Sequence, residues 1–412
     1  MIISGQWLVE SGLATLLFGG ISRLTTAICG RPSQGKYIGI ARLKIVIFGL
    51  TISSSWGNGH ATPYRAILRA LHRRGHRIVF YEKDVEYYAL RRDFQDCDFC
   101  DLVLYREWDE VRRQALTDVH DADVTVHASY CPGGARIIDE VGEAVSGLHV
   151  FYDLDTPITL ANLNAGAVDY LRREQIPRFD LYLSFTGGKI LQELEQQWGA
   201  SCARALYGCA DPEVYRRVPE QREFGCVLSY MGTYAQDRQE KLNQLFVEPA
   251  RQLPEEQFVL AGSLYPHDWR WPANVRYFDH VAPEQHPAMY SSSRFTLNIT
   301  RGDMARKGYC PSGRFFEAAA CGTPILSDWF EGLDSFFQPG EEIAVVNDAR
   351  QMLAVLEMTE YERTAMAGRA RERTLTEHSG ARRAEQLLGY LQEARARKRS
   401  AETRFIGLET AS

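Results

Sequence analysis

Apolar and polar residues follow two rhythms along this chain from Lys44 onward. Short runs rich in Val, Ile, Leu and Phe lie between longer segments of helical periodicity, a pattern typical of β-α units around a parallel sheet. Ile67, Leu68 and Leu71 form an apolar stripe that ends at Gly75, which predicts a helix at residues 61–74. The first series of apolar runs predicts strands at residues 44–50, 77–82, 124–128, 148–153, 181–185 and 204–207.

A second series of the same kind begins after Pro219. Residues 208–219, which separate the two series, carry two prolines and no clear periodicity, so they are the best candidate for a connection between domains. A chain of 412 residues also favours two domains, because single hydrophobic cores stop growing near ~250–300 residues. The second series predicts strands at residues 226–231, 257–261, 275–278, 295–299, 325–327 and 343–346, and a long charged helix follows at about 381–397.

These patterns predict an α/β protein with two doubly wound, Rossmann-like domains that face each other across a cleft. The expected parts are an N-terminal extension at 1–43, a first domain at 44–212, a second domain at 213–378, and a C-terminal helix and tail at 379–412. The extension is apolar but interrupted by Glu10 and Arg23, so we do not expect it to be an integral membrane segment. It also lacks the early basic residues of a signal peptide, and we expect it to be poorly ordered.

Composition narrows the class of protein. A hydrophobic share of 45% and a charged share of 24% are those of an ordinary globular chain. The formal net charge of −6 argues against a general nucleic-acid binder, so any phosphate site must be local. Nine scattered cysteines indicate thiols in a reducing compartment, which favours the cytoplasm. The lone Cys97-x-x-Cys100 has no second pair, so we expect neither zinc binding nor redox chemistry there.

Candidate chemistry follows the strands, because open parallel sheets bind ligands at the carboxyl ends of their strands. After the first strand, Gly57, Asn58 and Gly59 form a small-residue loop that would let a ligand approach the backbone closely. His60 then begins the helix, where it could act as a base or hydrogen-bond a phosphate. The alternatives are a plain tight turn and a histidine that only caps the helix.

The fourth strand leads into a loop that carries Asp153, Asp155 and Thr156, with Pro157 at the start of the next helix. Two carboxylates at the cleft could bind acceptor hydroxyls or deprotonate one of them. The alternative is helix capping by Asp155 or Thr156.

The second domain begins with a strand and a glycine turn that contains Gly232 and Thr233 and leads to Arg238. The turn and the helix start predicted after it resemble the anion cradle of the first domain, so these residues are candidate phosphate contacts.

Residues 300–324 carry the strongest signal. Ser312 is a good N-cap for a short helix at 315–321 that Gly322 ends. Arg301 and Arg314 can neutralise a diphosphate, and Glu317 can accept hydrogen bonds from the vicinal hydroxyls of a ribose. The alternative is an internal ion pair between Arg314 and Glu317 on the helix surface.

This segment, with its Glu in a short helix closed by Ala-Cys-Gly-Thr-Pro, resembles the donor site of glycosyltransferases of the GT-B architecture. Together with the loops at 49–60, 155–157 and 231–234, it makes the chain look like the CgeB-like branch, named for a spore maturation protein. The resemblance covers roughly residues 44–390. It implies nucleotide-sugar binding in the second domain, acceptor binding in the first, and a last helix that crosses back to the first domain.

One position departs from that family. Many retaining GT-B enzymes carry another Glu eight positions before the ribose-binding Glu, and this chain has Tyr309 there. Tyr309 is kept among the residues expected at the donor, while the stereochemical outcome stays open. If the reaction inverts, His60, Asp153 or Asp155 would be the base, and if it retains, the leaving phosphate could take the acceptor proton.

The expected activity is transfer of a sugar from a nucleotide diphosphate sugar to a hydroxyl of a glycan, lipid or protein, as in hexosyltransferases. The nucleotide sugar is a co-substrate, and neither a cofactor nor a metal is expected. No nucleic-acid partner is expected, while peripheral membrane contact stays open. Two rivals remain: a nucleotide-sugar epimerase of the same architecture, and a non-catalytic protein that binds sugar nucleotides or assembles a surface.

Overall fold

The computed structural model describes residues 42–93 and 97–409. The poorly ordered extension predicted at 1–43 therefore lies outside the described residues, except for Arg42 and Leu43. Two parallel sheets organise the rest of the chain, which confirms the predicted fold class.

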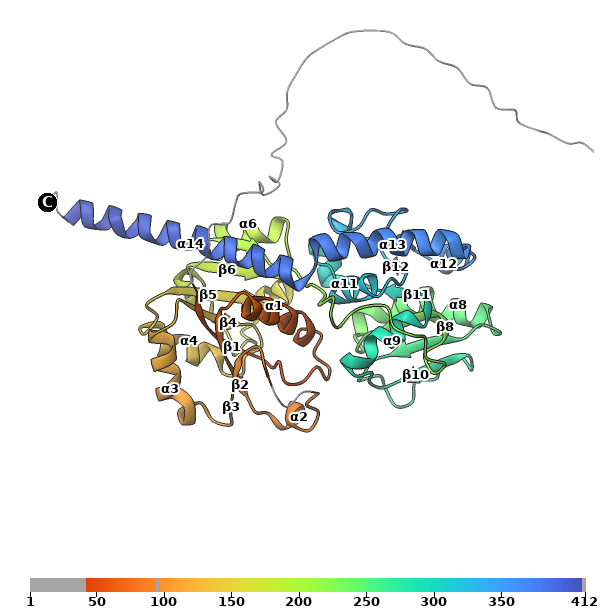
Figure 1. Ribbon diagram of the computed structural model, residues 1–412, viewed down its shortest axis with the longest axis horizontal. Coiled ribbons are helices and arrows are strands. Elements are labelled where there is room, and N and C mark those ends of the chain that lie inside the picture. Colours follow the sequence, from red (N-terminus) through yellow and green to blue (C-terminus); the bar gives the residue numbers. More distant parts are fainter. Residues whose placement is uncertain (1–41, 94–96, 410–412) are drawn as a thin grey trace, which may run out of the picture. The chain divides into compact units, whose positions relative to one another are not determined.

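The first domain contains a seven-stranded parallel sheet in the order β3-β2-β1-β4-β5-β6-β7 (Figure 1). In its register, Ile45 of β1 lies between Ile78 of β2 and Val124 of β4. The strands are β1 (Lys44–Gly49), β2 (Arg77–Lys83), β3 (Asp101–Tyr105), β4 (Val124–Ala128), β5 (Leu148–Asp153), β6 (Leu181–Ser184) and β7 (Ala203–Ala205). The helices are α1 (Ala61–Arg73), α2 (Glu86–Ala89), α3 (Trp108–His120), α4 (Gly134–Gly142), α5 (Thr156–Asn164) and α6 (Lys189–Gln196), with a 3₁₀ turn at Arg173–Arg178.

The second domain contains a six-stranded parallel sheet in the order β10-β9-β8-β11-β12-β13. The segment between β7 and β8 includes the predicted connection at 208–219, while the exact domain boundaries stay predictions. The strands are β8 (Cys226–Met231), β9 (Phe258–Ala261), β10 (Val275–Phe278), β11 (Ser293–Asn298), β12 (Ile325–Ser327) and β13 (Ala344–Val345). The helices are α7 (Gln239–Leu242), α8 (Glu248–Gln252), α9 (His286–Ser291), α10 (Gly302–Lys307), α11 (Gly313–Ala320), α12 (Ala349–Leu356) and α13 (Glu360–Glu377).

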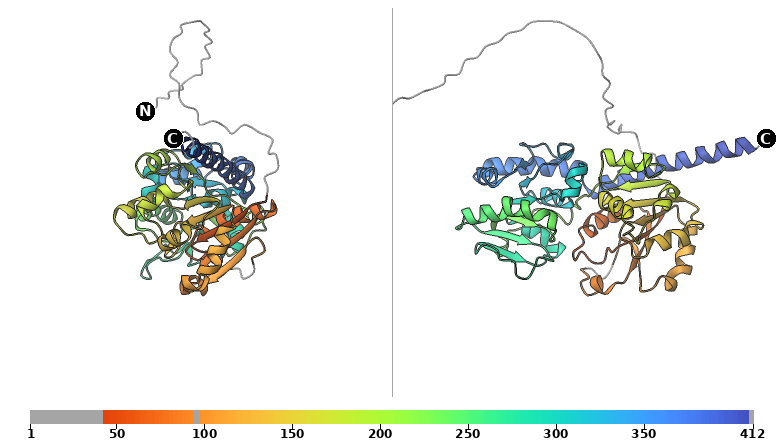
Figure 2. Two further views of the ribbon diagram at one scale, coloured as in Figure 1. Left: turned by 90° about the vertical axis from the view of Figure 1, so that its left-hand side faces the viewer. Right: turned by 180° about the vertical axis from the view of Figure 1, so that it is seen from behind.

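The last helix, α14 (Gly380–Glu409), returns to the first domain and packs against α1 (Figures 1 and 2). Arg395 pairs with Asp123 at 2.9 Å, and Lys398 pairs with Asp180 at 2.9 Å. Both acidic partners belong to the first domain, whereas α13, directly before α14, packs against α11 of the second domain. The helix therefore makes the crossing that the family resemblance implies, and it is longer than predicted.

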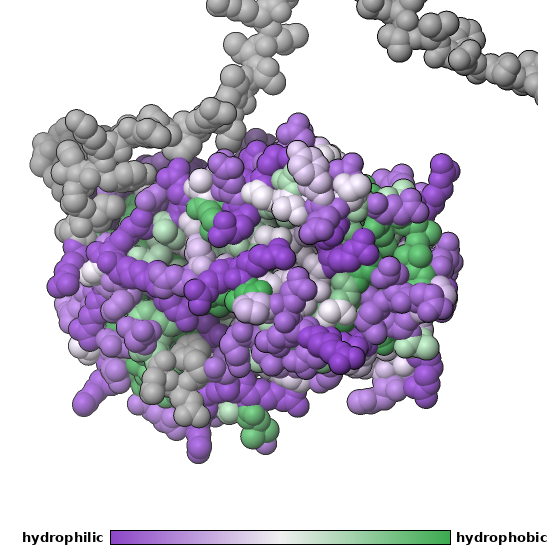
Figure 3. Space-filling model, turned by 45° about the vertical axis from the view of Figure 1, so that its right-hand side comes forward, coloured by the Kyte–Doolittle hydropathy of each residue, from purple (hydrophilic) through white to green (hydrophobic). Residues whose placement is uncertain are grey.

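None of the helices between residues 42 and 409 combines the length and apolarity that crossing a bilayer requires. The face shown in Figure 3 is hydrophilic over most of its area, with smaller apolar areas between. The exposed large apolar side chains are Tyr87, Leu90, Leu104, Leu264, Trp329 and Tyr361.

Two histidines lie in the core of the first domain. His127 of β4 and His149 of β5 have ring centroids 5.1 Å apart, and both rings lie against Phe179. Neither ring nitrogen of His127 has a hydrogen-bond partner in the described parts of the chain. Burial holds the pKa of His127 well below its usual value and lowers the pKa of His149 to about 4. The fold therefore holds both rings in the neutral form.

These histidines predict that the first domain loses stability in mild acid. Below pH ~6.5 the unfolded chain binds a proton on each ring that the folded chain does not bind. The free energy of unfolding should therefore fall by up to about 1.4 kcal/mol per pH unit for each histidine, between pH ~6.5 and the lowered folded pKa. The free energy of unfolding, measured with denaturant at several pH values, should depend less steeply on pH in His127→Phe than in the wild type. In the exposed-site control His120→Phe its dependence on pH should be unchanged. Equal slopes in the wild type and His127→Phe would contradict this account.

Candidate functional site

A cavity of about 330 Å³ lies where loops of the two domains meet. The loops that line it follow β1, β5 and β6 of the first domain and β8, β9, β10 and β11 of the second, which is where parallel sheets place their ligands. All but three of the predicted site residues line this cavity: Gly57, Asn58, Gly59, His60, Asp155, Gly232, Thr233, Arg238, Arg301, Ser312, Arg314 and Glu317. Asp153, Thr156 and Tyr309 do not.

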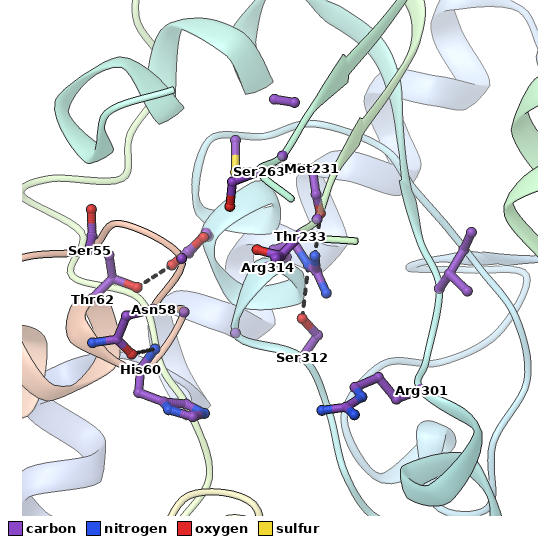
Figure 4. Close-up of a pocket in the computed structure, with 18 of the residues that line it drawn as sticks. Ser55, Asn58, His60, Thr62, Met231, Thr233, Ser263, Arg301, Ser312 and Arg314 are labelled. Carbon is purple, nitrogen blue, oxygen red and sulfur yellow. Dashed lines mark hydrogen bonds between the residues drawn. The ribbon is translucent and has the colours of Figure 1, made fainter. Parts of the chain in front are cut away.

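Three arginines give the second-domain side of the cavity a positive charge. Arg301 extends into it from the loop after β11 and Arg314 from the first turn of α11 (Figure 4), and Arg238 is 7% exposed in its wall. Burial, followed by the charges of neighbours that include Arg314 and Arg301, lowers the pKa of Arg238. Within the described residues, neither Arg238 nor Arg314 forms an ion pair, and Arg301 has only Asp237 at 3.8 Å. Such a cluster of like charges favours an anionic ligand.

Backbone contacts hold two of these arginines in place. Arg314 donates from Nη1 to the carbonyl of Met231 and from Nε to Oγ of Ser312 at 3.1 Å (Figure 4). Arg238 donates from Nη2 to the carbonyl of Thr233, while its buried Nε has no partner. The guanidinium groups are therefore oriented before any ligand arrives, which reduces the cost of ordering them on binding.

The turn after β8 differs from the predicted cradle. The N–H of Gly232 donates to the carbonyl of Ala261 at 2.8 Å, and the N–H of Tyr234 donates to the carbonyl of Ser263 at 2.9 Å. Both N–H groups are already paired within the protein, so the predicted phosphate contact of this turn rests on Thr233 between them. Gly262 lets the two loops approach, because a Cβ there would lie 2.0 Å from the carbonyl oxygen of Gly232.

The helix predicted at 315–321 is α11, which begins at Gly313. Ser312 occupies the N-cap position, but its hydroxyl accepts from Arg314 and makes no cap hydrogen bond. The alternative Arg314–Glu317 ion pair is not formed, because Arg314 contacts Met231 and Ser312. The first turn of α11 thus directs Arg314 to the cavity and leaves Glu317, one turn later, for another ligand.

Glu317 is a buried acceptor in the cavity wall, with 5% of its surface exposed. Its Oε1 accepts a hydrogen bond from Oγ1 of Thr62 at 2.6 Å, across the two domains. Burial, followed by the charge of Glu317, raises the pKa of both Tyr215 and Tyr290. An ionised carboxylate accepts several hydrogen bonds at once, so Glu317 can receive ligand hydroxyls in addition to that of Thr62.

His60 and Asp155 come together on the first-domain side of the cavity. Nε2 of His60 lies 3.6 Å from Oδ2 of Asp155, and the hydroxyl of Tyr130 donates to the same oxygen at 2.9 Å. The ring of His60 stacks on that of Tyr130, with centroids 5.9 Å apart. Neither His60 nor Asp155 makes a side-chain cap hydrogen bond, although each occupies an N-cap position. Neither side chain therefore caps its helix, and the carboxylate of Asp155 lies within ion-pair distance of the imidazole of His60.

Asp153 and Thr156 are buried behind the cavity wall, where they hold the loop that follows β5. Asp153 has none of its surface exposed, and it accepts hydrogen bonds from Tyr182, Thr159 and the backbone N–H of Asp155. Burial raises the pKa of Asp153 to about 6. Oγ1 of Thr156 lies 2.7 Å from Oγ of Ser184. The structure contradicts a direct ligand contact for these two side chains, because their polar atoms are already paired in the interior.

Tyr309 likewise does not line the cavity, so a donor contact of its side chain stays a prediction. Its backbone is left-handed, with φ of 48°. The ring occupies the space where a Cβ on Gly188 or Gly332 would lie, 2.5 and 2.4 Å from the nearest ring atoms. The N–H of Tyr309 donates to the carbonyl of Glu331, and its own carbonyl accepts from Gly187 at 2.9 Å. Tyr309 therefore joins loops of the two domains.

This packing predicts that Gly332→Ala is strongly destabilising. Gly332 has φ of +87°, and an added methyl group would enter the ring of Tyr309. Gly340 is a matched control, because its φ is +80° and nothing lies within 4 Å of the position that an added methyl group would take. We expect Gly340→Ala to lower the free energy of unfolding by about 1 kcal/mol through backbone strain alone, and Gly332→Ala by about 3 kcal/mol. Equal losses in denaturant unfolding would show that the ring contact is unimportant.

Sequence reasoning missed several cavity residues. Besides Thr62, the cavity is lined by His280 and His286, which follow β10. The ring of Trp56 lies 4.5 Å from that of His280 across the two domains, and the guanidinium of Arg91 lies 3.5 Å from the centroid of Trp56. In the sequence, this contact is indicated only by the position of Trp56 next to Gly57. Across residues 42–93 and 97–409, no three His, Cys, Asp or Glu side chains gather closely enough to hold a metal ion.

Comparisons with known proteins identify the architecture. Residues 238–389 match a family described as glycosyl transferase-like, and no curated protein sequence matches the chain. Among solved structures, the chain is similar to sucrose-phosphate synthase from Thermosynechococcus elongatus, with 13% identity and a TM-score of 0.58 over 86% of this chain and 100% of that chain. It is similar to HepE from Anabaena in complex with UDP and glucose, with 11% identity and a TM-score of 0.60 over 85% and 100%.

A third similar structure is an α-glucosyltransferase in complex with UDP-glucose and DNA containing an abasic site. The identity is 14% and the TM-score 0.66, over 85% of this chain and 100% of that chain. These likenesses show the GT-B fold. The family match covers less than half of the chain, but it includes Arg238, Arg301, Arg314 and Glu317.

Proposed function

We propose that this chain is a glycosyltransferase that moves a hexosyl group from a nucleotide diphosphate sugar to a hydroxyl acceptor. The glycosyl transferase-like segment and the GT-B fold support sugar transfer from a nucleotide sugar. The observation that carries the proposal is the cavity in which Arg238, Arg301 and Arg314 surround space for an anion beside the buried carboxylate of Glu317. The placement of the chain in the CgeB-like branch is part of the proposal.

On the donor side, the three arginines would stabilise the charge that develops on the leaving diphosphate. Arg238 and Arg314 are held by backbone carbonyls, so they need little reorganisation as the glycosidic bond breaks. Glu317 would accept hydrogen bonds from the two ribose hydroxyls, with Thr62 holding one of its oxygens. These side chains supply the positive charge, so the proposed reaction uses no metal and no cofactor.

On the acceptor side, His60 would remove the proton of the attacking hydroxyl. It lies across the cavity from Arg301 and Arg314 (Figure 4), and Asp155 would stabilise the imidazolium that forms. A base that activates an acceptor opposite the leaving group leads to inversion at the anomeric carbon. Asp153 would act as a positioning residue, since it accepts a hydrogen bond from the backbone N–H of Asp155.

The acceptor would enter between the loops of the first domain. Gly57, Asn58 and Gly59 line the cavity there and leave backbone accessible to a ligand. A glycan, a lipid or a protein can each supply the hydroxyl. A lipid acceptor would bring the enzyme to a membrane surface, and a protein acceptor would make it bind a protein partner. The proposed location is the cytoplasm, where nucleotide sugars and reduced cysteines are both expected.

The experiment that tests the proposal is an assay of nucleotide diphosphate release. The protein is incubated with UDP-, GDP- and TDP-linked hexoses, alone and with pools of sugar, lipid and peptide acceptors, and products are followed by mass spectrometry. We expect release that depends on an acceptor, and a product whose anomeric configuration, measured by NMR, is inverted. Formation of a sugar isomer without an acceptor would support the epimerase, and tight donor binding without turnover would support a non-catalytic binding protein.

A further inference from the structure

Cys97 and Cys100 lie outside the donor cavity, in the loop that leads into β3. Their Sγ atoms are 3.0 Å apart. Among the described residues, this is the only hydrogen bond between two cysteines. A disulfide has an S–S length of about 2.05 Å, so closing the pair needs an approach of only about 1 Å. Cys97 is half-buried and Cys100 is buried, so only the first thiol is open to a reagent.

The two thiols differ in acidity as an attacking and a resolving cysteine would. The hydrogen bond from Cys100 lowers the pKa of Cys97 to about 7, so a large share of Cys97 is thiolate near neutral pH. The same contact, with burial, raises the pKa of Cys100 and keeps it protonated. By contrast, burial raises the pKa of Cys131, Cys209 and Cys310.

We propose that Cys97 and Cys100 are a site of reversible oxidation that closes to an intramolecular disulfide by exchange with a low-molecular-weight disulfide. The Cys97 thiolate attacks one sulfur of the reagent, which breaks its S–S bond and releases one thiol. Cys100 then loses its proton to solvent and attacks Sγ of Cys97, which releases the second thiol. Two electrons pass from the protein to the reagent, and the two protein protons are balanced by those on the two released thiols.

The place of this loop links the pair to the connection between the domains. Phe99, between the two cysteines, is buried, and the guanidinium of Arg69 lies 4.9 Å from its ring centroid. Arg69 pairs with Asp211 of the connection at 3.1 Å. Asp98 and Phe99 also share a cavity of about 220 Å³ with residues 211, 213 and 214. Closing the disulfide would therefore change the loop that packs against this connection.

The test is a redox titration of the full-length protein in glutathione buffers that range from fully reduced to mostly oxidised. Thiols are quenched by alkylation, and peptides are quantified by mass spectrometry. We expect the Cys97–Cys100 disulfide to form in one two-electron transition, to revert with excess reduced glutathione, and to leave as thiols the six other cysteines that the structure describes. A pair that stays reduced throughout the series, or that forms disulfides with other cysteines, would overturn the proposal.

Variants separate the two roles. Cys100→Ser should stop at a glutathione adduct on Cys97, Cys97→Ser should form neither product, and the control Cys131→Ser should behave as the wild type. An adduct on Cys100 in Cys97→Ser would contradict the assignment of the attacking thiol. Amide hydrogen exchange at residues 208–219 should differ between the oxidised and reduced protein, and identical exchange would overturn the link to the connection.

Discussion

Replacing His60 with alanine is expected to lower kcat by about 10²- to 10⁴-fold, the usual contribution of a positioned general base. The nucleotide affinity should change little, because His60 lies across the cavity from Arg301 and Arg314 (Figure 4). The measurement is steady-state transfer with the donor and acceptor that the release assay identifies, together with the dissociation constant of the nucleotide.

Matched variants test whether the neighbours of His60 act through it. Asp155→Asn keeps the shape but removes the charge 3.6 Å from Nε2, so kcat should fall by a smaller factor than in His60→Ala. In a double variant the two losses should not add, because both act on the same proton transfer. If His60→Ala retains kcat within about twofold, well below the factor expected of a base, the leaving phosphate takes the proton instead.

The second large effect is expected for Arg314. Arg314→Met should lower kcat/KM by about 10²- to 10³-fold, because it removes an oriented donor from the charge that develops on the leaving group. Arg314→Lys should recover only part of the loss, since an ammonium cannot contact the carbonyl of Met231, Ser312 and a diphosphate in the same fork geometry. Steady-state kinetics with the nucleotide sugar measures both.

A control for charge alone is Arg251→Met, at an exposed arginine of α8 outside the cavity. It should keep kcat/KM within about twofold, because exposed charges far from a site are screened by salt. Similar losses in Arg251→Met and Arg314→Met would mean that the net charge of the domain, and not the local cluster, governs donor use.

Most of the fold could be predicted because the apolar runs are buried strands. β4, β5 and β12 have the predicted bounds, and each is fully buried, as expected for strands covered on both faces. β3 was missed although residues 102–105 are a short apolar run; it is an edge strand, and most of its residues are exposed or only partly buried. The last helix was predicted too short because its residues 399–401 and 403 are exposed, so no apolar stripe marks how far the helix continues.

The sequence predicted several of the loops that line the cavity. It did not predict for every side chain of those loops whether it points into the cavity. Asp153 and Asp155 were both predicted in the loop after one strand. Asp153 is instead the last residue of β5, and its carboxylate points into the core, so only Asp155 reaches the cavity. Tyr309 turns away because its left-handed backbone places the ring between two glycines. Thr62 and His280 could not be found from the sequence, since they join the site only when the two domains meet.

The central claim is that the cavity binds the nucleotide of a sugar donor through Glu317. Thermal unfolding of the wild type, Glu317→Ala and the exposed-site control Glu341→Ala, each with UDP, GDP, TDP and CMP and their sugar conjugates, tests it most directly. A ligand at about 100 times its dissociation constant stabilises by about 2.7 kcal/mol, which is visible as a rise in Tm. We predict a rise with one nucleotide class that is kept in Glu341→Ala and lost in Glu317→Ala, whereas no rise with any nucleotide, or an equal rise in all three proteins, would contradict the claim.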